Sequence, residues 1–261
     1  MNERVVGVDY WHGRVAARFG DAAHSYDDHS AAQRHAATSL AGRIVAASLP
    51  PRPRVLEIGC GTGHLTARLA DRLPGASIVA TDIAPAMVAA CQRRLGSNPR
   101  LEFTVMDGTR PDTSAPFDVI CASLAAQWFA DLPGALARLA VRLAPGGLLA
   151  LCIPGAATFR EWRVAHERLG LVPGALALPS AATIRAALPA DGAARIAIEH
   201  WHDRPPHGLD FLRGLRAIGA HTAAPGHTPL PPAQLRRVLS ALGPQPVIGY
   251  ELIHLLWRKG G

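Results

Sequence analysis

The sequence predicts an α/β protein with a doubly wound parallel sheet, because buried-strand patterns and amphipathic helix patterns alternate along its middle part. Apolar runs predict five strands, at Arg54–Ile58, Ser77–Thr81, Leu101–Met106, Phe117–Cys121 and Leu148–Ile153. Apolar residues at three- and four-residue intervals predict helices between them, at Leu65–Leu73, Pro85–Leu95 and Leu132–Leu143. This repeated strand–helix–strand order favours right-handed crossovers and a parallel sheet.

Segments on both sides of this core are predicted to add further helices and strands. Before it, Ser30 is expected to cap a helix over Ala31–Ser48 that Pro50 and Pro51 end. After it, prolines separate short segments, with strands expected at Ile196–Trp201 and Tyr250–Trp257 and helices at Leu209–Ile218 and Pro232–Leu242. We therefore expect a helical preface that acts as a lid (1–50), a core (51–153), a helical cap inserted over the strand ends (154–246) and a final core strand (247–261).

Composition limits the class of protein. The 261 residues are 49 % hydrophobic and 18 % charged, which is typical of a folded globular chain. Neither a signal peptide nor an apolar run of the ~20 residues that a membrane span needs is recognisable, so we expect a cytoplasmic protein without a membrane anchor. The four cysteines lie about 30 residues apart without a Cys-x-x-Cys pair, as in successive β-α units, which predicts reduced and mostly buried thiols.

The charge balance is basic, with a net charge of +7 that arises almost entirely from arginine. A positive surface favours an acidic partner, either an acidic protein or a nucleic acid. No dense Lys/Arg run is present, so a nucleic-acid-binding arm is not indicated. His200 and His202 would share one face of a strand, but the further ligands that a zinc site needs are not visible, and no metal is expected.

A glycine-rich turn follows the first predicted strand, in the segment Val55-Leu-Glu-Ile-Gly-Cys-Gly-Thr-Gly63. Gly59, Gly61 and Gly63 would let the backbone turn tightly and let a ligand approach its amides. A dinucleotide-binding turn would have its third glycine at position 64, which is His64 here. Glu57, just before the turn, would repel a pyrophosphate but suits the cationic amino-acid end of S-adenosylmethionine.

Acidic residues also end the next two predicted strands. Asp82 lies 19 residues beyond Gly63, near the spacing expected for an acid that binds ribose hydroxyls, and Ile83 beside it would pack on the adenine. Asp107, after the third strand, would accept the adenine amino group. Each acid alone would equally suit a helix cap or a solvated loop. Together with the glycine turn, they resemble the signature of class I (Rossmann-like) methyltransferases, which implies S-adenosylmethionine as cofactor and S-adenosylhomocysteine as its product.

A narrower resemblance extends over about Arg18 to Lys259. Its motifs, in chain order, are Arg18–Tyr26 followed by Gln33-Arg34, Leu124-Ala-Ala-Gln-Trp128, Leu212–Ala220 and Tyr250-Glu-Leu-Ile253. They resemble the malonyl-acyl-carrier-protein O-methyltransferases of biotin synthesis. That family implies methylation of the free carboxylate of a malonyl thioester, carried by an acidic acyl carrier protein or by coenzyme A. The chain departs from this pattern at Ala122-Ser123, where the family commonly has Ser-Asn, and at Gly249, where it often has Thr, and both changes are expected to affect the acceptor pocket.

The chemistry that the resemblance implies needs no general base, because a carboxylate is already ionised at neutral pH. Tyr26 is a candidate lid residue over the cofactor, and Gln127 and Trp128 are candidates for the pocket wall beside the methyl group. Arg213 and Arg216 are candidates for orienting the malonyl carboxylate through the two-pronged guanidinium. They would equally suit a solvated helix face, or contacts to an acidic carrier or to the phosphopantetheine phosphate.

Other functions remain open on the sequence alone. They are methylation of another small carboxylic acid, methylation of RNA, and an assembly or regulatory protein that binds the cofactor without methylating. The RNA hypothesis lacks recognition modules and interleaved aromatic and basic residues. The choice of carrier and the oligomeric state do not follow from the sequence.

Overall fold

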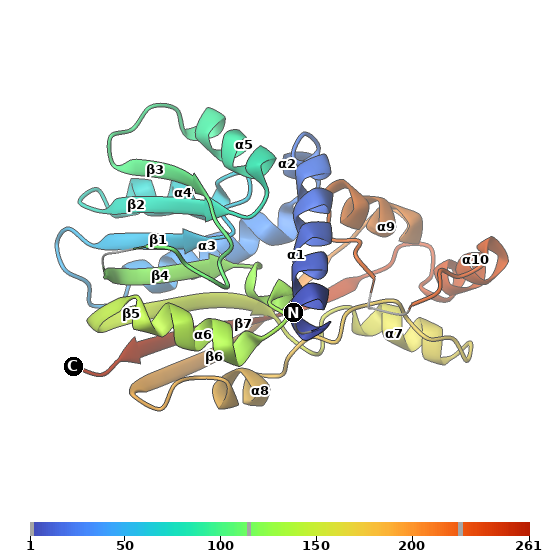
Figure 1. Ribbon diagram of the computed structural model, residues 1–261. Coiled ribbons are helices and arrows are strands. Elements are labelled where there is room, and N and C mark those ends of the chain that lie inside the picture. The colour runs from blue at the N-terminus through green and yellow to red at the C-terminus, as the bar shows by residue number, and fades with distance from the viewer. Residues whose placement is uncertain (1–2, 114–115, 224–226) are drawn as a thin grey trace.

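The computed structural model describes residues 3–113, 116–223 and 227–261, and over these residues it forms a seven-stranded sheet with helices on both faces (Figure 1). The strands are β1 (Arg54–Ile58), β2 (Ser77–Asp82), β3 (Leu101–Val105), β4 (Phe117–Ser123), β5 (Leu143–Pro154), β6 (Gly192–Asp203) and β7 (Ile248–Lys259). The predicted α/β class is therefore confirmed, and each predicted strand is present. The last three strands are longer than predicted: β5 already pairs with β4 at Leu143, and the ladder between β6 and β7 runs from Gly192 to Asp203 of β6.

The strands lie in the order β3-β2-β1-β4-β5-β7-β6. β1 to β5 are parallel, whereas β7 runs antiparallel to both of its neighbours, β5 and β6. The chain builds outward from β1 to β3 on one side and then from β4 to β5 on the other. The strand order thus reverses between β1 and β4, and open α/β sheets bind ligands beyond the carboxyl ends of the strands at such a point.

Helices cover both faces of the sheet because side chains alternate along each strand. Val119 and Cys121 of β4 belong to the core under one set of helices, whereas Ile120 between them packs with the opposite set. The first set is α3 (Ala31–Val45), α4 (His64–Arg72) and α5 (Pro85–Leu95), and the second is α6 (Leu132–Val141) and α8 (Ala181–Ala186). All four cysteines are buried and free, as predicted.

A helix that the sequence did not delimit, α1 (Glu3–Ala22), stands across the carboxyl ends of the strands (Figure 1). Ser25, which follows it, donates from Oγ to the carbonyl of Ala217 at 2.9 Å. Gly219 has φ +76°, and a Cβ there would lie 2.7 Å from the carbonyl oxygen of Arg18. Close packing therefore joins α1 to the cap, which contains α7 (Arg160–Glu167), α9 (Gly208–Ala217) and α10 (Pro232–Ala241) besides α8, whereas the short helix α2 (Tyr26–His29) belongs to the preface with α1.

Ser30 is the N-cap residue of α3, as predicted, but the expected capping hydrogen bond is absent. Its hydroxyl accepts from no backbone N–H of the first turn; it accepts from the Arg34 guanidinium at 3.1 Å, lies 2.9 Å from His64 Nε2 and donates to the carbonyl of Asp27. A buried imidazole has thus replaced the helix amide as the partner of this hydroxyl. A side-chain cap is present at α6, where Asp131 accepts from the N–H of Gly134 at 3.0 Å.

Within the described ranges, no helix has the length and apolar character needed to cross a bilayer.

Candidate active site

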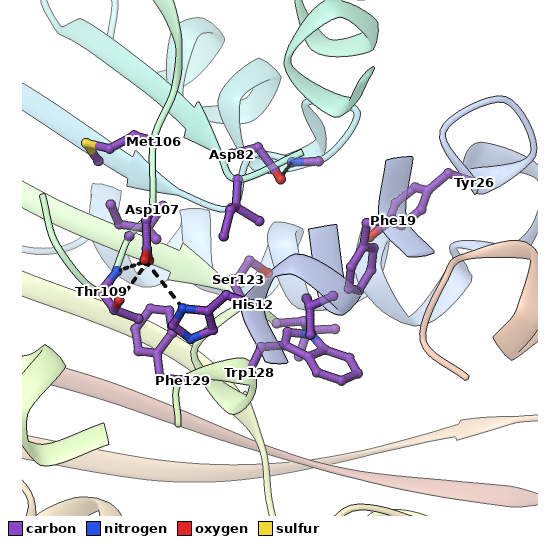
Figure 2. Close-up of a pocket in the computed structure, with 18 residues that line it drawn as sticks. His12, Phe19, Tyr26, Asp82, Met106, Asp107, Thr109, Ser123, Trp128 and Phe129 are labelled. Atoms are coloured by element: carbon purple, nitrogen blue, oxygen red, sulfur yellow. Dashed lines mark hydrogen bonds and ion pairs between the residues drawn. The ribbon is translucent and has the colours of Figure 1, made fainter. Parts of the chain in front are cut away.

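Two adjoining cavities lie beyond the carboxyl ends of the strands. The first, here called the strand-end cavity, is walled by the β1–α4 turn, by residues at the ends of β2, β3 and β4, and by α1 (Figure 2). The second, here called the cap cavity, measures about 640 Å³ and lies between α1, α7, α9, α10 and the start of β7. Such a volume is typical of pockets for small ligands.

The glycine turn forms one wall of the strand-end cavity. Gly59 and Gly61 have φ of +69° and +54°, a backbone region that side chains with a Cβ rarely adopt. A Cβ on Gly59 would come within 2.5 Å of Ala125 Cβ, whereas one on Gly61 would point toward the Tyr26 hydroxyl, 3.8 Å away. Gly63, with φ +93°, lies at the N-cap of α4 and is outside this wall. Gly59 therefore lets the turn approach Ala125 closely, Gly61 leaves the space toward Tyr26 open, and Gly63 shapes the turn.

Asp82 links the end of β2 to the glycine turn. Its Oδ2 accepts from the N–H of Gly61 and its Oδ1 from the N–H of Ala84, both at 2.9 Å. The side chain is nearly buried, and burial raises the pKa of this carboxyl although the backbone N–H bonds lower it. Each carboxylate oxygen retains a lone pair for a hydroxyl donor. Ile83 lines the same cavity.

Asp107 lies across the strand-end cavity from Asp82 (Figure 2). Its Oδ1 accepts from both the N–H and the hydroxyl of Thr109 at 2.8 Å, and its Oδ2 lies 3.4 Å from Nδ1 of His12 on α1. Nε2 of His12 is buried and has no partner among the described residues. His12 therefore joins α1 to the strand ends and presents an unpartnered nitrogen at the cavity wall.

Glu57 lies beneath the glycine turn rather than at the cavity wall, with 1 % of its surface exposed. Burial raises the pKa of its carboxyl to about 7, although a hydrogen bond from Thr66 lowers it. Its Oε2 has no partner among the described residues. A buried carboxylate with one unpartnered oxygen, an open glycine turn and two acids at strand ends fit the cationic amino acid, the ribose and the adenine of S-adenosylmethionine.

The cap cavity has a mostly apolar wall, to which Phe159, Trp162 and Phe211 contribute. Buried polar atoms without a partner among the described residues also belong to residues of this wall: Gln33 Oε1, Gln127 Oε1, Trp128 Nε1, His221 Nδ1 and Thr222 Oγ1. Buried polar atoms in folded proteins nearly always have a hydrogen-bond partner. Their concentration in one cavity indicates a ligand that carries several donors and acceptors.

The two cavities meet at four residues that line both: Phe19, Tyr26, Leu124 and Trp128. The rings of Phe19 and Trp128 pack edge to face with centroids 5.5 Å apart (Figure 2). Leu124 has φ +52°, a strained conformation that costs about 1–3 kcal/mol and is common at functional sites. This junction is where ligands in the two cavities would touch.

Most residues predicted for the acceptor side gather in the cap cavity. Tyr26, Gln127, Trp128 and Arg216 all line it. Arg213 does not: its side chain is 67 % exposed on α9 and pairs with Asp210 at 3.0 Å. Sequence reasoning also missed residues at these walls, namely His12, Arg18 and His221. Arg18 is the first residue of the family motif Arg18–Tyr26, and only this motif pointed to it in the sequence.

The two departures from the family pattern lie at different depths. Ala122 is buried within β4, whereas Ser123 lines the strand-end cavity. Gly249 lines neither cavity; its N–H donates to Oε2 of Glu161 at 2.9 Å. The change at Gly249 therefore alters the contact between β7 and α7 and not a cavity wall.

Comparison with known proteins agrees with this geometry. A family model described as "Methyltransferase domain" matches residues 56–149. The YcgJ protein from Bacillus subtilis has a similar fold, with a TM-score of 0.63 at 17 % identity, over 86 % of this chain and 99 % of that one. The fold, the glycine turn and the acids at the strand ends define an S-adenosylmethionine-dependent methyltransferase with a class I core.

Curated relatives narrow the class. The chain is 41 % identical over 230 residues to a malonyl-[acyl-carrier protein] O-methyltransferase of Magnetococcus marinus, covering 88 % of this chain and 85 % of that protein. It is 44 % identical over 247 residues to the biotin biosynthesis bifunctional protein BioCD of Bordetella avium, of whose length it spans 52 %. The chain belongs to the malonyl-[acyl-carrier protein] O-methyltransferase family.

Proposed function

We propose that this protein transfers the methyl group of S-adenosylmethionine to the free carboxylate of a malonyl thioester, giving its methyl ester. The observation that carries the proposal is the junction of the two cavities, since a donor in one and an acceptor in the other would meet at Phe19, Tyr26, Leu124 and Trp128. The names of the relatives supply the substrate class, a malonyl group on an acyl carrier protein.

The residues of the strand-end cavity are assigned to the cofactor. Asp82 would bind the ribose hydroxyls, Ile83 would pack on the adenine, and Asp107 would accept from the adenine amino group. Glu57 would balance the charge of the amino-acid end from beneath the turn. The three glycines, Gly59, Gly61 and Gly63, would let the turn approach the ligand and begin α4.

The reaction needs little chemistry from the protein. The bound cofactor supplies an activated methyl group; a carboxylate oxygen forms the new O–C bond while the C–S bond breaks and sulfur keeps the electron pair. No proton moves, because the carboxylate is ionised, and no residue is needed as a base. The protein's share is to align the two groups and to exclude water from the carboxylate. Tyr26, 9 % exposed beside Gly61, suits the second task.

The elements around the two cavities are assigned as a lid and a cap. Helix α1 contributes His12 and Val15 to the strand-end cavity, and Phe19 to both cavities, so ligands are enclosed only while it stays in place. The cap segment 154–246 supplies much of the wall of the cap cavity and nothing to the strand-end cavity. This division assigns the core to the cofactor and the cap to the acceptor.

The test is transfer of labelled methyl from S-adenosylmethionine to malonyl-carrier protein, with malonyl-coenzyme A and acetyl-carrier protein in parallel. We expect one added methyl, as an ester detectable by mass spectrometry, on the malonyl substrates and none on the acetyl control. Product on the acetyl control would contradict transfer to the free carboxylate. Cofactor binding without product on any thioester would leave another small carboxylic acid, an RNA or a non-catalytic role as the function.

A further inference from the structure

The two ends of the cap cavity differ in charge and in exposure. At the inner end, next to the cofactor, the only nitrogen that the four junction side chains offer is the uncharged indole N–H of Trp128, which is buried and unpartnered. At the outer end, Arg18 from α1 and Arg216 from α9 line the cavity and are both exposed to solvent. The cavity is therefore neutral where the methyl group would arrive and cationic where it opens.

A guanidinium would be a poor partner for the carboxylate that reacts. Its fork binds a carboxylate through both oxygens, although one of them must be free to attack the methyl group. Its positive charge also lowers the nucleophilicity of the carboxylate. The single N–H of Trp128 can bind only one oxygen and leaves the second free. Neither Arg18 nor Arg216 lines the strand-end cavity, so neither reaches the wall beside the methyl donor.

The outer end is suited to a different anion. Among the described residues, no acidic side chain forms an ion pair with Arg18 or Arg216. His221 lines the same cavity, and burial, together with the charges of Arg18 and Arg216, lowers the pKa of its imidazole. Two unpaired guanidinium groups at an exposed rim form a site for a phosphate.

We propose that the acceptor lies along the cap cavity with its carboxylate at the indole N–H of Trp128 and the phosphate of its phosphopantetheine arm at Arg18 and Arg216. This orientation rests on the proposed function and assigns Arg216 to the phosphate instead of the carboxylate. The arm between the two ends carries two amides. Gln33 Oε1, Gln127 Oε1 and Thr222 Oγ1 are unpartnered groups of the intervening wall that can bind them.

Binding of the phosphate can be distinguished from binding of the carboxylate with four acceptors that share the malonyl thioester. They are malonyl-pantetheine, which has no phosphate, malonyl-phosphopantetheine, malonyl-coenzyme A and malonyl-carrier protein. For Arg18→Gln and Arg216→Gln we expect KM to rise about 10- to 100-fold with the three phosphate-bearing acceptors, the loss typical of a charge-assisted hydrogen bond. With malonyl-pantetheine, KM should stay within about twofold of the wild-type value. Arg213→Gln, on the same helix but outside the cavity, should change none of the four.

The contrary outcome is equally specific. If Arg216→Gln raises KM with malonyl-pantetheine as much as with malonyl-phosphopantetheine, the arginine binds the carboxylate and the proposed orientation is wrong. The last two acceptors decide the source of the phosphate, since a preference for the carrier-linked form that survives in both variants would indicate further contacts with the carrier protein. A wild-type enzyme that methylates none of the four would contradict the proposed function instead.

The inner end is tested by Trp128→Phe, which keeps an aromatic ring against Phe19 but removes the N–H. We expect kcat to fall about 10-fold or more with all four acceptors, while the affinity for S-adenosylhomocysteine, measured by calorimetry, stays within about threefold. An unchanged kcat would remove the indole N–H from the site.

The phosphate site can also be tested without variants, through inhibition by acetyl-phosphopantetheine, which should exceed inhibition by acetyl-pantetheine about 10- to 100-fold. Equal inhibition would contradict a phosphate site.

Discussion

The two cavities are built from the chain in opposite ways. Apart from four residues of α1 and α2, the strand-end cavity is lined by residues within the segment 58–129, placed there by successive strand ends of the parallel sheet. The cap cavity collects residues from position 18 to position 250, and most of its wall comes from helices and loops of the cap. A site made by strand ends is fixed by the backbone ladder, whereas a site made by cap helices depends on side-chain packing between distant segments.

This difference matches the tasks assigned to the two cavities. The cofactor is one molecule, and a rigid wall of backbone amides and buried carboxylates serves it in many proteins that share the fold. The acceptor varies, and helices inserted outside the sheet can change without disturbing the ladder. We therefore expect substitutions to separate into two groups, those that affect cofactor binding alone and those that affect acceptor use alone.

The largest expected effect is that of Asp82→Ala, which should raise the dissociation constant for S-adenosylhomocysteine at least about 100-fold, because two hydrogen bonds to a charged group are lost. It also frees the N–H of Gly61, which the carboxylate holds at 2.9 Å. Calorimetry measures the affinity. Asp118→Ala is a matched control, since its carboxylate also accepts a backbone N–H, that of Arg54, at the far end of the sheet. Full cofactor affinity in Asp82→Ala would end the assignment of the strand-end cavity to the cofactor.

A smaller effect concerns Glu57, whose folded pKa of about 7 lies above the ordinary value of 4.5. Between these two pH values the unfolded chain has lost this proton and the folded chain keeps it. The free energy of unfolding of the ligand-free protein should therefore fall with rising pH across this window, by about 3 kcal/mol from this one group. Urea unfolding at pH 5 and pH 8 should show a pH dependence smaller by this amount in Glu57→Gln.

Protonation of Glu57 should be coupled to ligand binding in the strand-end cavity and not to binding in the cap cavity. A cationic group on the cofactor favours ionised Glu57, so cofactor binding should release a proton below pH 7 and weaken as pH falls. Calorimetry in buffers of different ionisation enthalpy measures this release. Binding of an acceptor analogue to the cofactor-loaded protein should release no such proton. A proton released on acceptor binding would show that the two cavities are not electrostatically separate.

The smallest expected effect is that of Gly249→Thr, which restores the residue common in the family. A Cβ there would lie 3.3 and 3.4 Å from the carboxylate oxygens of Glu161, a close contact that offsets the preference of strands for threonine. We expect the free energy of unfolding to change by less than about 1 kcal/mol and KM for the malonyl acceptor by less than about twofold. Gly249→Ala isolates the contribution of the Cβ. A larger change in KM would show that the contact between β7 and α7 reaches the cap cavity.

The sequence was informative where structure is local. The strands, the glycine turn and the acids after β2 and β3 follow from short patterns whose geometry a parallel sheet enforces, which is why Asp82 and Asp107 were found together. The bounds of helix α1 were not predicted, because three glycines interrupt its pattern and its contacts are with residues far away in the sequence. For example, Trp11 Nε1 donates to the carbonyl of Trp128 at 3.1 Å. His12 of this helix, which lies beside Asp107, was not predicted as a site residue for the same reason.

The acceptor side was predictable only through motifs. Gln127, Trp128 and Arg216 were named from the family resemblance, and all three line the cap cavity. The resemblance could not separate Arg216 from Arg213, since three positions on a helix differ by about 300° in direction, and only the packing of α9 decides which one faces inward. His221 carries no sequence signal at all, because its position depends on how the end of the cap returns to α1.

The place of β7 has a consequence for how the protein is made. This last strand is inserted between β5 and β6 and contributes Tyr250 to the cap cavity. On the ribosome, β1 to β5 and their helices emerge well before Ile248, so the half that contains the glycine turn can assemble while the rest is still being synthesised. Until β7 arrives, β5 and β6 each leave a row of backbone groups unpaired and open to association. The nascent chain would thus pass through a stage that is ready for a cofactor but has no acceptor site, with an exposed sheet edge that invites chaperone binding or aggregation.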